Sequence, residues 1–318
     1  MNFIESNTHR IKQLAATLGF DDCGIAKAQR LDDDARRLEA WLNQGHHGKM
    51  GYMANHFEKR IDPTRLVDGA KSVITLVLNY FPKQSIDLGG FKIARYAYGD
   101  DYHDVIRAKL RTFMQCIEDE VGPVAGRGFV DSAPVLERAW AVKSGLGWVG
   151  KNGNLIMKGK GSYFFIATLI VDLELQPDAI FATDHCGRCT QCIDACPTQA
   201  ILPNKTIAAN QCISYFTIEL KEAFTGNEPA WNDWVFGCDI CQEVCPWNRF
   251  SQAHQTSNFN VNERLFEWQK QTNTSSISLI TSEWFSFVFK NSPLKRSGYD
   301  RFMRNIDHVL QKNNKALQ

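Results

Sequence analysis

Eight of the ten cysteines in this chain lie in one stretch, between Cys186 and Cys245. In the first run, three cysteines are two residues apart, and a fourth follows after three more residues and precedes a proline: Cys186, Cys189, Cys192, Cys196 and Pro197. This spacing is typical of proteins with two four-iron clusters, in which the first three thiolates hold one cluster and the fourth reaches the other. The pattern therefore predicts iron–sulfur chemistry and the transfer of single electrons.

A second run completes the ligand count for a second cluster. It has the same Cys-Pro ending but one cysteine fewer, and Cys212 lies between the runs to supply the missing thiolate. The crossover rule predicts one group of Cys186, Cys189, Cys192 and Cys245, and another of Cys196, Cys212, Cys238 and Cys241. Zinc is the alternative, but a zinc site needs only four ligands and neither the triple run nor the eighth cysteine.

Length and composition indicate an ordinary globular protein. The 318 residues are enough for two or three domains, and 44% hydrophobic with 22% charged residues argue against disorder. Lys plus Arg is 36 and Asp plus Glu is 35, so the overall charge says nothing about a nucleic-acid partner. Ten cysteines in 318 residues are too small a share for a secreted disulfide scaffold, and no apolar run approaches the length of a membrane span. We expect a cytoplasmic protein without a membrane segment.

The elements that must position this chemistry alternate between helical and strand patterns. Apolar periodicity predicts helices over residues 4–18, 31–43, 104–121 and 134–144. Apolar and β-branched runs predict strands over residues 72–80, 154–157 and 162–172, and a short strand before residue 129. The alternation predicts an α/β or α+β layer fold, with the strand order left open.

An ordered set of short segments resembles the epoxyqueuosine reductases, cobalamin-dependent tRNA-modifying enzymes related to reductive dehalogenases. Besides the cysteine runs, the segments are EKRIDP at 58–63, ARYAYGDDYHDV at 94–105, FVDSAPVLERAWA at 129–141, GLGWVGKN at 145–152, GSYFFIA at 161–167, CIS at 212–214 and GCDICQEVCPWN at 237–248. Each is weak alone, but together and in this order they are specific and extend over nearly the whole chain.

The resemblance implies an α+β fold of three parts: a nitroreductase-like cobalamin-binding domain over residues 1–176, a bacterial-ferredoxin-like module with two [4Fe-4S] clusters over 177–250, and a C-terminal helical, tRNA-contacting segment over 251–318. The reaction it implies is the last step of queuosine biosynthesis, reduction of epoxyqueuosine to queuosine at the wobble position of tRNAs with GUN anticodons. Electrons would pass through the clusters to cobalamin, which rests as cob(II)alamin and reacts as cob(I)alamin. The implied partners are the anticodon stem-loops of the tyrosine, histidine, asparagine and aspartate tRNAs and an external low-potential electron donor, and we expect a monomer.

Asp131, in FVDSAP, matches the proton donor of that family. An epoxide oxygen is a poor leaving group until it is protonated, and a buried carboxyl beside an apolar corrin would have a raised pKa that keeps it protonated near neutrality. The alternative is that Asp131 or Ser132 caps the helix expected from Pro134.

Six further positions match residues that line or face cobalamin in the family: Arg60, Ala94, Leu155, Ile166, Ser214 and Asp239. Leu155 and Ile166 are equally well interpreted as strand core, and Arg60 as one half of an ion pair with Asp62 or Glu58. The segment around His103 lacks the glycine of the DxHxxG cobalamin motif. We therefore expect no histidine ligand on cobalt and interpret His103 as an ordinary helix-start residue.

The segment from Trp284 onward has seven Lys or Arg against two acids, with aromatic residues between them. Basic side chains neutralise phosphates and planar rings stack on splayed bases. The predicted tRNA contacts are Lys295, Arg296 and Arg301 by charge, and Arg304 and Asn305 by their match to the family. The alternative is a solvated helix face with an inward aromatic stripe.

Two other functions remain open. A reductive dehalogenase-like enzyme acting on a small organohalide is the second hypothesis, although such enzymes are usually exported and the first residues show no apolar signal core. A non-catalytic electron carrier is the third, although it would not need a large domain before the cysteine runs.

Overall fold

The computed structural model describes residues 2–86, 88–266 and 280–316. Its N-terminal half is built on an antiparallel four-stranded sheet in the order β1-β2-β7-β4, formed by β1 (Asp22–Lys27), β2 (Ser72–Asn79), β7 (Phe164–Val171) and β4 (Gly126–Phe129). The central strands β2 and β7 are buried along most of their length. Near-continuous burial explains why both strands read as apolar runs rather than as alternating patterns.

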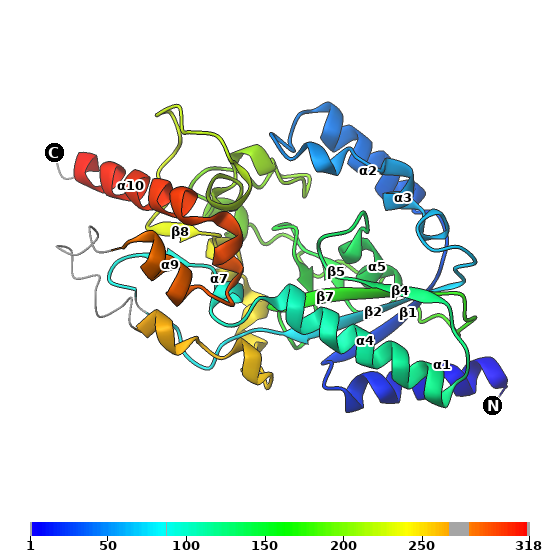
Figure 1. Ribbon diagram of the computed structural model, residues 1–318. Helices are drawn as coiled ribbons and strands as arrows, with labels where there is room; N and C mark the ends of the chain where they lie inside the picture. The colour runs from blue at the N-terminus through cyan, green and yellow to red at the C-terminus, as the bar shows by residue number, and fades with distance from the viewer. Residues whose placement is uncertain (1, 87, 267–279, 317–318) are drawn as a thin grey trace.

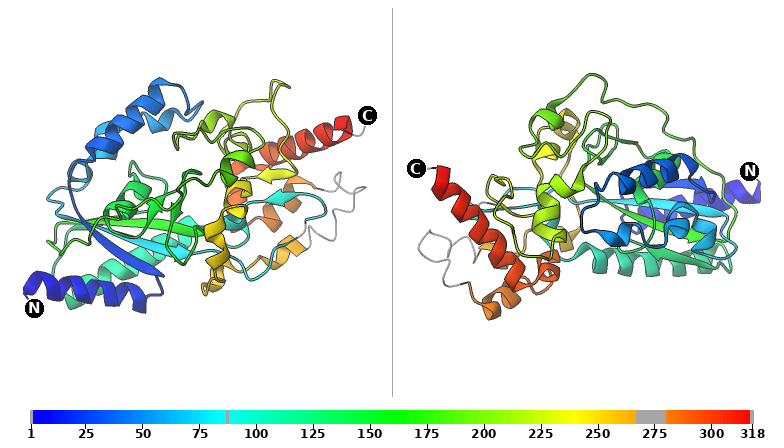
Figure 2. Two further views of the ribbon diagram at one scale, coloured as in Figure 1. Left: turned by 180° about the vertical axis from the view of Figure 1, so that it is seen from behind. Right: turned by 90° about the horizontal axis from the view of Figure 1, so that it is seen from above.

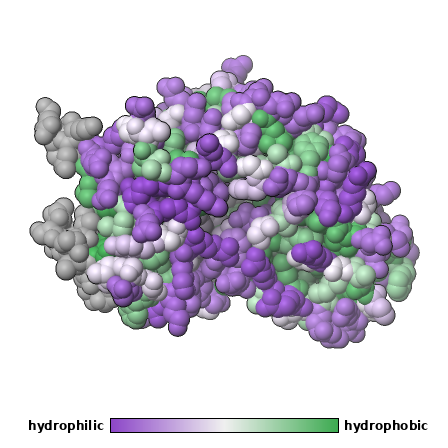
Figure 3. All heavy atoms as spheres, turned by 45° about the horizontal axis from the view of Figure 1, so that its top comes forward, coloured by the Kyte–Doolittle hydropathy of each residue, from purple (hydrophilic) through white to green (hydrophobic). Residues whose placement is uncertain are grey.

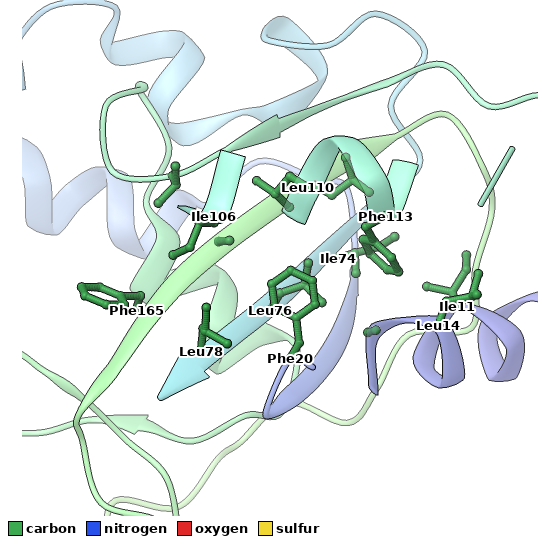
Figure 4. Close-up of a cluster of buried hydrophobic side chains, with 14 of the residues drawn as sticks. Ile11, Leu14, Phe20, Ile74, Leu76, Leu78, Ile106, Leu110, Phe113 and Phe165 are labelled. Carbon is green, nitrogen blue, oxygen red and sulfur yellow. The ribbon is translucent and has the colours of Figure 1, made fainter. Parts of the chain in front are cut away.

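Helices cover both faces of this sheet. On one face α1 (Phe3–Thr17) lies beside α4 (Tyr102–Glu120), and α5 (Glu137–Lys143) packs on the other face (Figures 1 and 2). The side chains that fill the space under α1 and α4 come from both helices, from β2 and β7, and from the turn between α1 and β1 (Figure 4): Ile11, Leu14, Phe20, Ile74, Leu76, Leu78, Ile106, Leu110, Phe113 and Phe165. Burial of this apolar surface is the main favourable term in the folding of the N-terminal half.

Smaller elements complete the N-terminal half. An arm of α2 (Asp32–Asn43) and α3 (Phe57–Ile61) lies on the α5 side of the sheet, and its own small core joins Ala35, Leu38 and Ile61 (Figure 1). A short hairpin is formed by β5 (Trp148–Val149) and β6 (Leu155–Ile156).

The C-terminal half carries the cysteine runs. Each run contains a short helix, α6 (Gln191–Asp194) in the first and α7 (Ile240–Glu243) in the second, and a π-helical turn, η5, spans Tyr215–Glu219. A second core is formed with α9 (Ser282–Val288) and α10 (Tyr299–Ala316). The termini lie at opposite ends of the molecule (Figure 2).

A segment from the N-terminal half crosses into this second core. β3 (Lys92–Ile93) pairs in parallel with β8 (Trp234–Phe236), and Ala94, Ala97 and Tyr98 are buried with the C-terminal side chains. The division expected at residues 176 and 250 stays a prediction as far as its exact boundaries are concerned. In the packed structure, however, the segment around β3 belongs with the C-terminal half.

The aromatic residues of the C-terminal segment are mostly interior. Phe285, Phe289 and Phe302 are at most 3% exposed, whereas Phe287 is 60% exposed. Most of these rings therefore form the inward aromatic stripe that was the alternative interpretation, and few of them are accessible for stacking on bases. Among the described residues, no helix has the length and apolar character needed to cross a membrane.

Candidate active site and metal centre

The cysteines gather in two groups. Cys186, Cys189, Cys192 and Cys245 line one cavity of about 230 Å³ together with Lys151 and Trp247. The indole Nε1 of Trp148 lies 3.5 Å from the Cys186 Sγ. Lys151 Nζ donates to the carbonyls of Gly187 and Cys189 at 2.8 and 2.9 Å, which fixes the loop between those two cysteines.

The cysteines of the second group are all half-buried. Burial raises the pKa of the Cys238 thiol, and the nearby Cys212 and Cys196 raise it further. The pKa of Cys241 is raised in the same way by burial and then by Cys238 and Cys212. Thiols in such a setting ionise only when a positively charged group binds them.

The two groups are those predicted from the spacing. Among residues 2–86, 88–266 and 280–316, no set of three or more histidine, cysteine, aspartate or glutamate side chains forms a site for one metal ion. Two quartets of thiols, one around a cavity and one half-buried, are a donor set that fits two four-iron clusters. The assignment of individual ligands stays a prediction.

The second cysteine group adjoins the segment that crosses from the N-terminal half. The Asp239 carboxylate is 2% exposed, accepts the Arg95 N–H at 2.7 Å and lies 3.5 Å from its guanidinium. Gly237 has a φ of +68°, and a Cβ there would lie 2.6 Å from the Ala94 side chain, so only glycine allows this approach. Ala94, Asp239 and the half-buried Ser214 thus lie where this segment meets the cysteine module.

Asp131 lies at the start of the segment between β4 and α5, and its side chain is 59% exposed. Its φ is +55°, an uncommon backbone conformation for an aspartate, and its N–H donates to Glu137 Oε1 at 2.7 Å. Its Oδ2 accepts a hydrogen bond from the Tyr102 hydroxyl and lies 3.3 Å from His103 Nε2. The carboxylate is therefore held by the first turn of α4 but remains accessible to a ligand.

Burial and hydrogen bonding act in opposite directions on the ionisation of Asp131. Burial acts to raise the pKa of this carboxyl, but hydrogen bonds from His103 and Tyr102 outweigh it, and the pKa lies below its ordinary value. The expected raised pKa concerns a carboxyl beside a bound corrin and stays a prediction.

The alternative to the proton-donor role, helix capping by Asp131 or Ser132, is wrong. α5 begins at Glu137 rather than at Pro134, and its N-cap, Leu136, makes no side-chain cap hydrogen bond. Ser132 instead accepts a hydrogen bond from Arg107 at 2.8 Å. Neither Asp131 nor Ser132 is used to begin the helix.

His103 is held from the opposite side by Asp101. The Asp101 Oδ1 accepts the His103 backbone N–H at 3.0 Å, which caps α4, and lies 2.7 Å from the ring Nδ1. Asp101 Oδ2 in turn accepts from Arg296 Nε at 2.6 Å, so the C-terminal segment reaches this site. Burial acts to lower the pKa of His103, but hydrogen bonds to Asp101 and Asp131 outweigh it and raise the pKa.

Two further carboxyls face Asp131. Burial raises the pKa of Glu137 to about 8, and the neighbouring Asp131 charge adds to the shift. Burial and then Asp131 also raise the pKa of Glu219, at the end of the π-helical turn, while its hydrogen bond with Tyr52 acts in the opposite direction. Residues from α5, η5 and the arm therefore meet around one carboxylate.

Arg60 is buried near the same place, with only 8% of its surface exposed. Its Nη2 donates to the Tyr52 carbonyl at 3.0 Å, and its Nε has no hydrogen-bond partner within the described part of the chain. The alternative of an ion pair is wrong, because the carboxylates of Glu58 and Asp62 pair with other arginines. An unpaired buried donor of this kind fits a polar group on a bound ligand.

The remaining predicted residues have mainly structural surroundings. Leu155 is 4% exposed, and Ile166 is partly buried against the same cluster, as expected of strand core. In the C-terminal segment Lys295 and Arg296 are exposed, while Arg301 is half-buried and donates to the Ile218 carbonyl at 3.0 Å.

Arg304 and Asn305 are both engaged in contacts within the protein. The guanidinium of the half-buried Arg304 donates to the carbonyls of Phe216, Leu220 and Glu222 and stacks over Phe224. Asn305 is 0% exposed, so the structure contradicts its direct contact with RNA.

Sequence reasoning missed the groups around Asp131: Tyr52, Tyr102, His103, Glu137 and Glu219. The DxHxxG motif around His103 is incomplete, which favours the interpretation as an ordinary helix start. One signal for a different role is Asp101, two residues earlier, because an aspartate there can cap α4 and also bind the histidine ring. The remaining groups meet only through tertiary folding.

Comparisons with known proteins agree on one family. Residues 60–132 match the profile described as "Epoxyqueuosine reductase QueG, DUF1730", and residues 185–248 match "4Fe-4S double cluster binding domain". The chain is 53% identical to the epoxyqueuosine reductase of Cyclobacterium marinum over 97% of this chain and 98% of that protein. It is 41% identical to that of Pseudomonas aeruginosa over 93% of this chain and 82% of that protein.

Solved structures give the same result. A selenomethionine-labelled epoxyqueuosine reductase superposes with a TM-score of 0.84 at 25% identity, over 97% of this chain and 82% of that one. An epoxyqueuosine reductase with an epoxyqueuosine-modified stem-loop of tyrosine tRNA gives a TM-score of 0.83 at 25% identity, with the same coverage.

Proposed function

The chain belongs to the epoxyqueuosine reductase family, and we propose that it removes the epoxide oxygen of epoxyqueuosine in tRNA with Asp131 as the proton donor. The observation that carries the activity is identity of 53% over almost the full length of a member of this family. The reaction takes two electrons and two protons, breaks both carbon–oxygen bonds of the epoxide, and gives an alkene and water.

Asp131 suits the donor role through its position. Its Oδ2 is oriented by Tyr102 and His103, while 59% of its side chain remains exposed to an incoming base. A general acid must reach the atom that it protonates before its pKa matters. Entry of the modified base would remove water from the carboxylate, which favours its protonated form.

The eight clustered cysteines would hold the two [4Fe-4S] clusters, and cobalamin would bind beside Asp131. The clusters and cobalamin would supply the two electrons, one at a time, at low potential. Arg60 offers its unpaired Nε to the polar periphery of cobalamin. Ala94, Leu155, Ile166, Ser214 and Asp239 stay in the proposal through their match to the family, and three of them, Ala94, Leu155 and Asp239, are at most 4% exposed. Tyr96 is half-buried and lies near Asp131, Asp239 and Glu219.

The RNA-binding surface that we propose is smaller than the one expected from charge. Lys295 and Arg296 are exposed and adjoin the site through the Arg296–Asp101 ion pair. Figure 3 shows one face of the molecule, on which hydrophilic side chains predominate and hydrophobic patches lie between them. Arg301 adds a half-buried charge, while Arg304 and Asn305 support the surface from below.

The remaining parts of this proposal concern partners. The substrates are the anticodon stem-loops of the tRNAs for tyrosine, histidine, asparagine and aspartate, which places the reaction in the cytoplasm. An external low-potential donor would supply electrons to a monomeric enzyme.

An anaerobic assay with the reconstituted holoenzyme tests the function against its alternative. Epoxyqueuosine-containing tRNA and a small organohalide are offered separately with a strong reductant. Conversion of the tRNA base, followed by nucleoside mass spectrometry, supports the proposal. Dehalogenation without conversion of the tRNA base would instead support the dehalogenase hypothesis.

A further inference from the structure

The proposed reaction needs two protons at one oxygen, but a carboxylic acid carries one. The hydrogen bonds around Asp131 also keep its pKa below the ordinary value, so in the protein without substrate the carboxylate is charged. A second group must therefore store the protons that Asp131 delivers. This inference rests on the proposed function.

His103 is in direct contact with the Asp131 carboxylate, and its ring can carry a proton near neutrality. Its Nε2 lies 3.3 Å from Asp131 Oδ2, while its Nδ1 is held at 2.7 Å by Asp101. Because one ring nitrogen is fixed by Asp101, the other is aimed at Asp131. The ring also stacks on Tyr102, with centroids 4.1 Å apart, which further limits its rotation.

A chain of charged groups links His103 to the surface. Asp101 is 8% exposed and pairs with Arg296, whose side chain is 47% exposed. The first turn of α4 carries Asp101 and His103, and this end of α4 faces the C-terminal half (Figure 1). The titratable and charged groups around the ring are Asp101, Tyr102, Asp131, Glu137 and Arg296. Two of them, Asp101 and Asp131, bind the ring directly and favour its protonated form.

Glu137 does not fill this role, although its pKa is raised to about 8. Its Oε1 accepts the backbone N–H of Asp131 at 2.7 Å, so it holds the backbone of Asp131 in place. No hydrogen bond joins its carboxyl to that of Asp131 among the described residues. Glu137 is therefore a positioning residue.

We propose that His103 is the proton reservoir of the reaction and passes both protons to the substrate oxygen through Asp131. In the first transfer the imidazolium Nε2–H protonates the Asp131 carboxylate, which protonates the epoxide oxygen as the first carbon–oxygen bond breaks. After His103 takes up a proton from solvent, the same path protonates the resulting hydroxyl. It leaves as water while the second carbon–oxygen bond breaks and the alkene forms. The two electrons come from the reductant that the proposed activity already requires.

His103→Gln tests the reservoir, with His308→Gln as the matched control. Glutamine retains a donor but cannot carry a proton, and His308 is a buried histidine on α10 that binds the Pro229 carbonyl instead. In single turnovers of pre-reduced holoenzyme, His103→Gln should lower the rate by about 100-fold, and added imidazole should restore part of it. The wild-type rate should fall as pH rises through the pKa of His103, and the variant should lose this dependence. His308→Gln should behave as wild type.

A second readout does not depend on turnover. Histidine-selective NMR titration of the full chain should give His103 a pKa above that of an ordinary histidine, and Asp101→Asn should lower it. A wild-type rate and pH profile in His103→Gln, with active wild-type enzyme, would overturn the reservoir and leave the proposed function standing. If the wild type does not convert the tRNA, the proposed function fails. In that case an NMR titration that gives His103 the pKa of an ordinary histidine would overturn the reservoir as well.

Discussion

The variant Asn305→Ala distinguishes two roles for this residue: a structural role, and the RNA contact that its match to the family implies. The Asn305 side chain is 0% exposed, and its Nδ2 donates to the carbonyls of Thr217 and Val235 at 2.9 and 3.0 Å. Those carbonyls belong to the π-helical turn and to β8, so one amide joins α10 to both elements. Its Oδ1 also accepts from Arg304 at 3.0 Å.

Alanine at this position removes these hydrogen bonds and leaves buried carbonyls without partners. Each lost bond is worth about 1 kcal/mol net, and a buried unsatisfied group adds to the loss, so the free energy of unfolding should fall by about 2 to 4 kcal/mol. Asp307→Ala, at an exposed position on the same helix, should change it by less than about 0.5 kcal/mol.

The measurement is urea unfolding of both variants under anaerobic conditions, followed by far-UV circular dichroism, with stem-loop binding measured on the folded proteins. The account predicts an earlier unfolding midpoint for Asn305→Ala only, and near wild-type affinity for the stem-loop once the protein is folded. Unchanged stability together with weakened RNA binding would show that the burial argument is wrong.

Three other predictions follow from the same contacts. Cys241→Ser should lower bound iron from about eight to about four atoms per chain, while Cys116→Ser, on α4 outside both cysteine groups, should retain all of it. The pKa of Asp101 is lowered to about 2, because hydrogen bonds from His103 and Arg296 outweigh burial. The stability that this carboxylate contributes should therefore be complete above pH 3.8 and lost as pH falls toward 2, so acid unfolding of the wild type and of Asp101→Asn should converge there. Lys295→Ala should weaken stem-loop binding and reduce the slope of log affinity against log salt by about 1; an unchanged slope would exclude a phosphate contact.

Local patterns predicted much of the fold. The strand expected over residues 72–80 is β2, and the helix expected over 104–121 is α4, which begins two residues earlier. The cysteine spacing also predicted the two groups that the structure forms, because ligand spacing reflects the local path of the backbone around a cluster. Burial and periodicity are properties of short segments and can be read without knowledge of the topology.

Features that depend on distant contacts could not be predicted in this way. The parallel pairing of β3 with β8 joins residues far apart in the sequence, and no pattern within β3 indicates its partner. The role of His103 depends on Asp131 and on Arg296, which reach it from different parts of the chain. The burial of Asn305 likewise depends on distant contacts, because its amide joins α10 to the π-helical turn and to β8.

The most direct test of the account compares wild-type and Asp131→Asn holoenzymes for conversion of epoxyqueuosine to queuosine in tRNA, with iron and cobalamin measured on the same samples. The account predicts conversion by the wild type and none by Asp131→Asn, with equal cofactor content. Conversion at the wild-type rate by Asp131→Asn, or none by fully loaded wild-type enzyme, would contradict it.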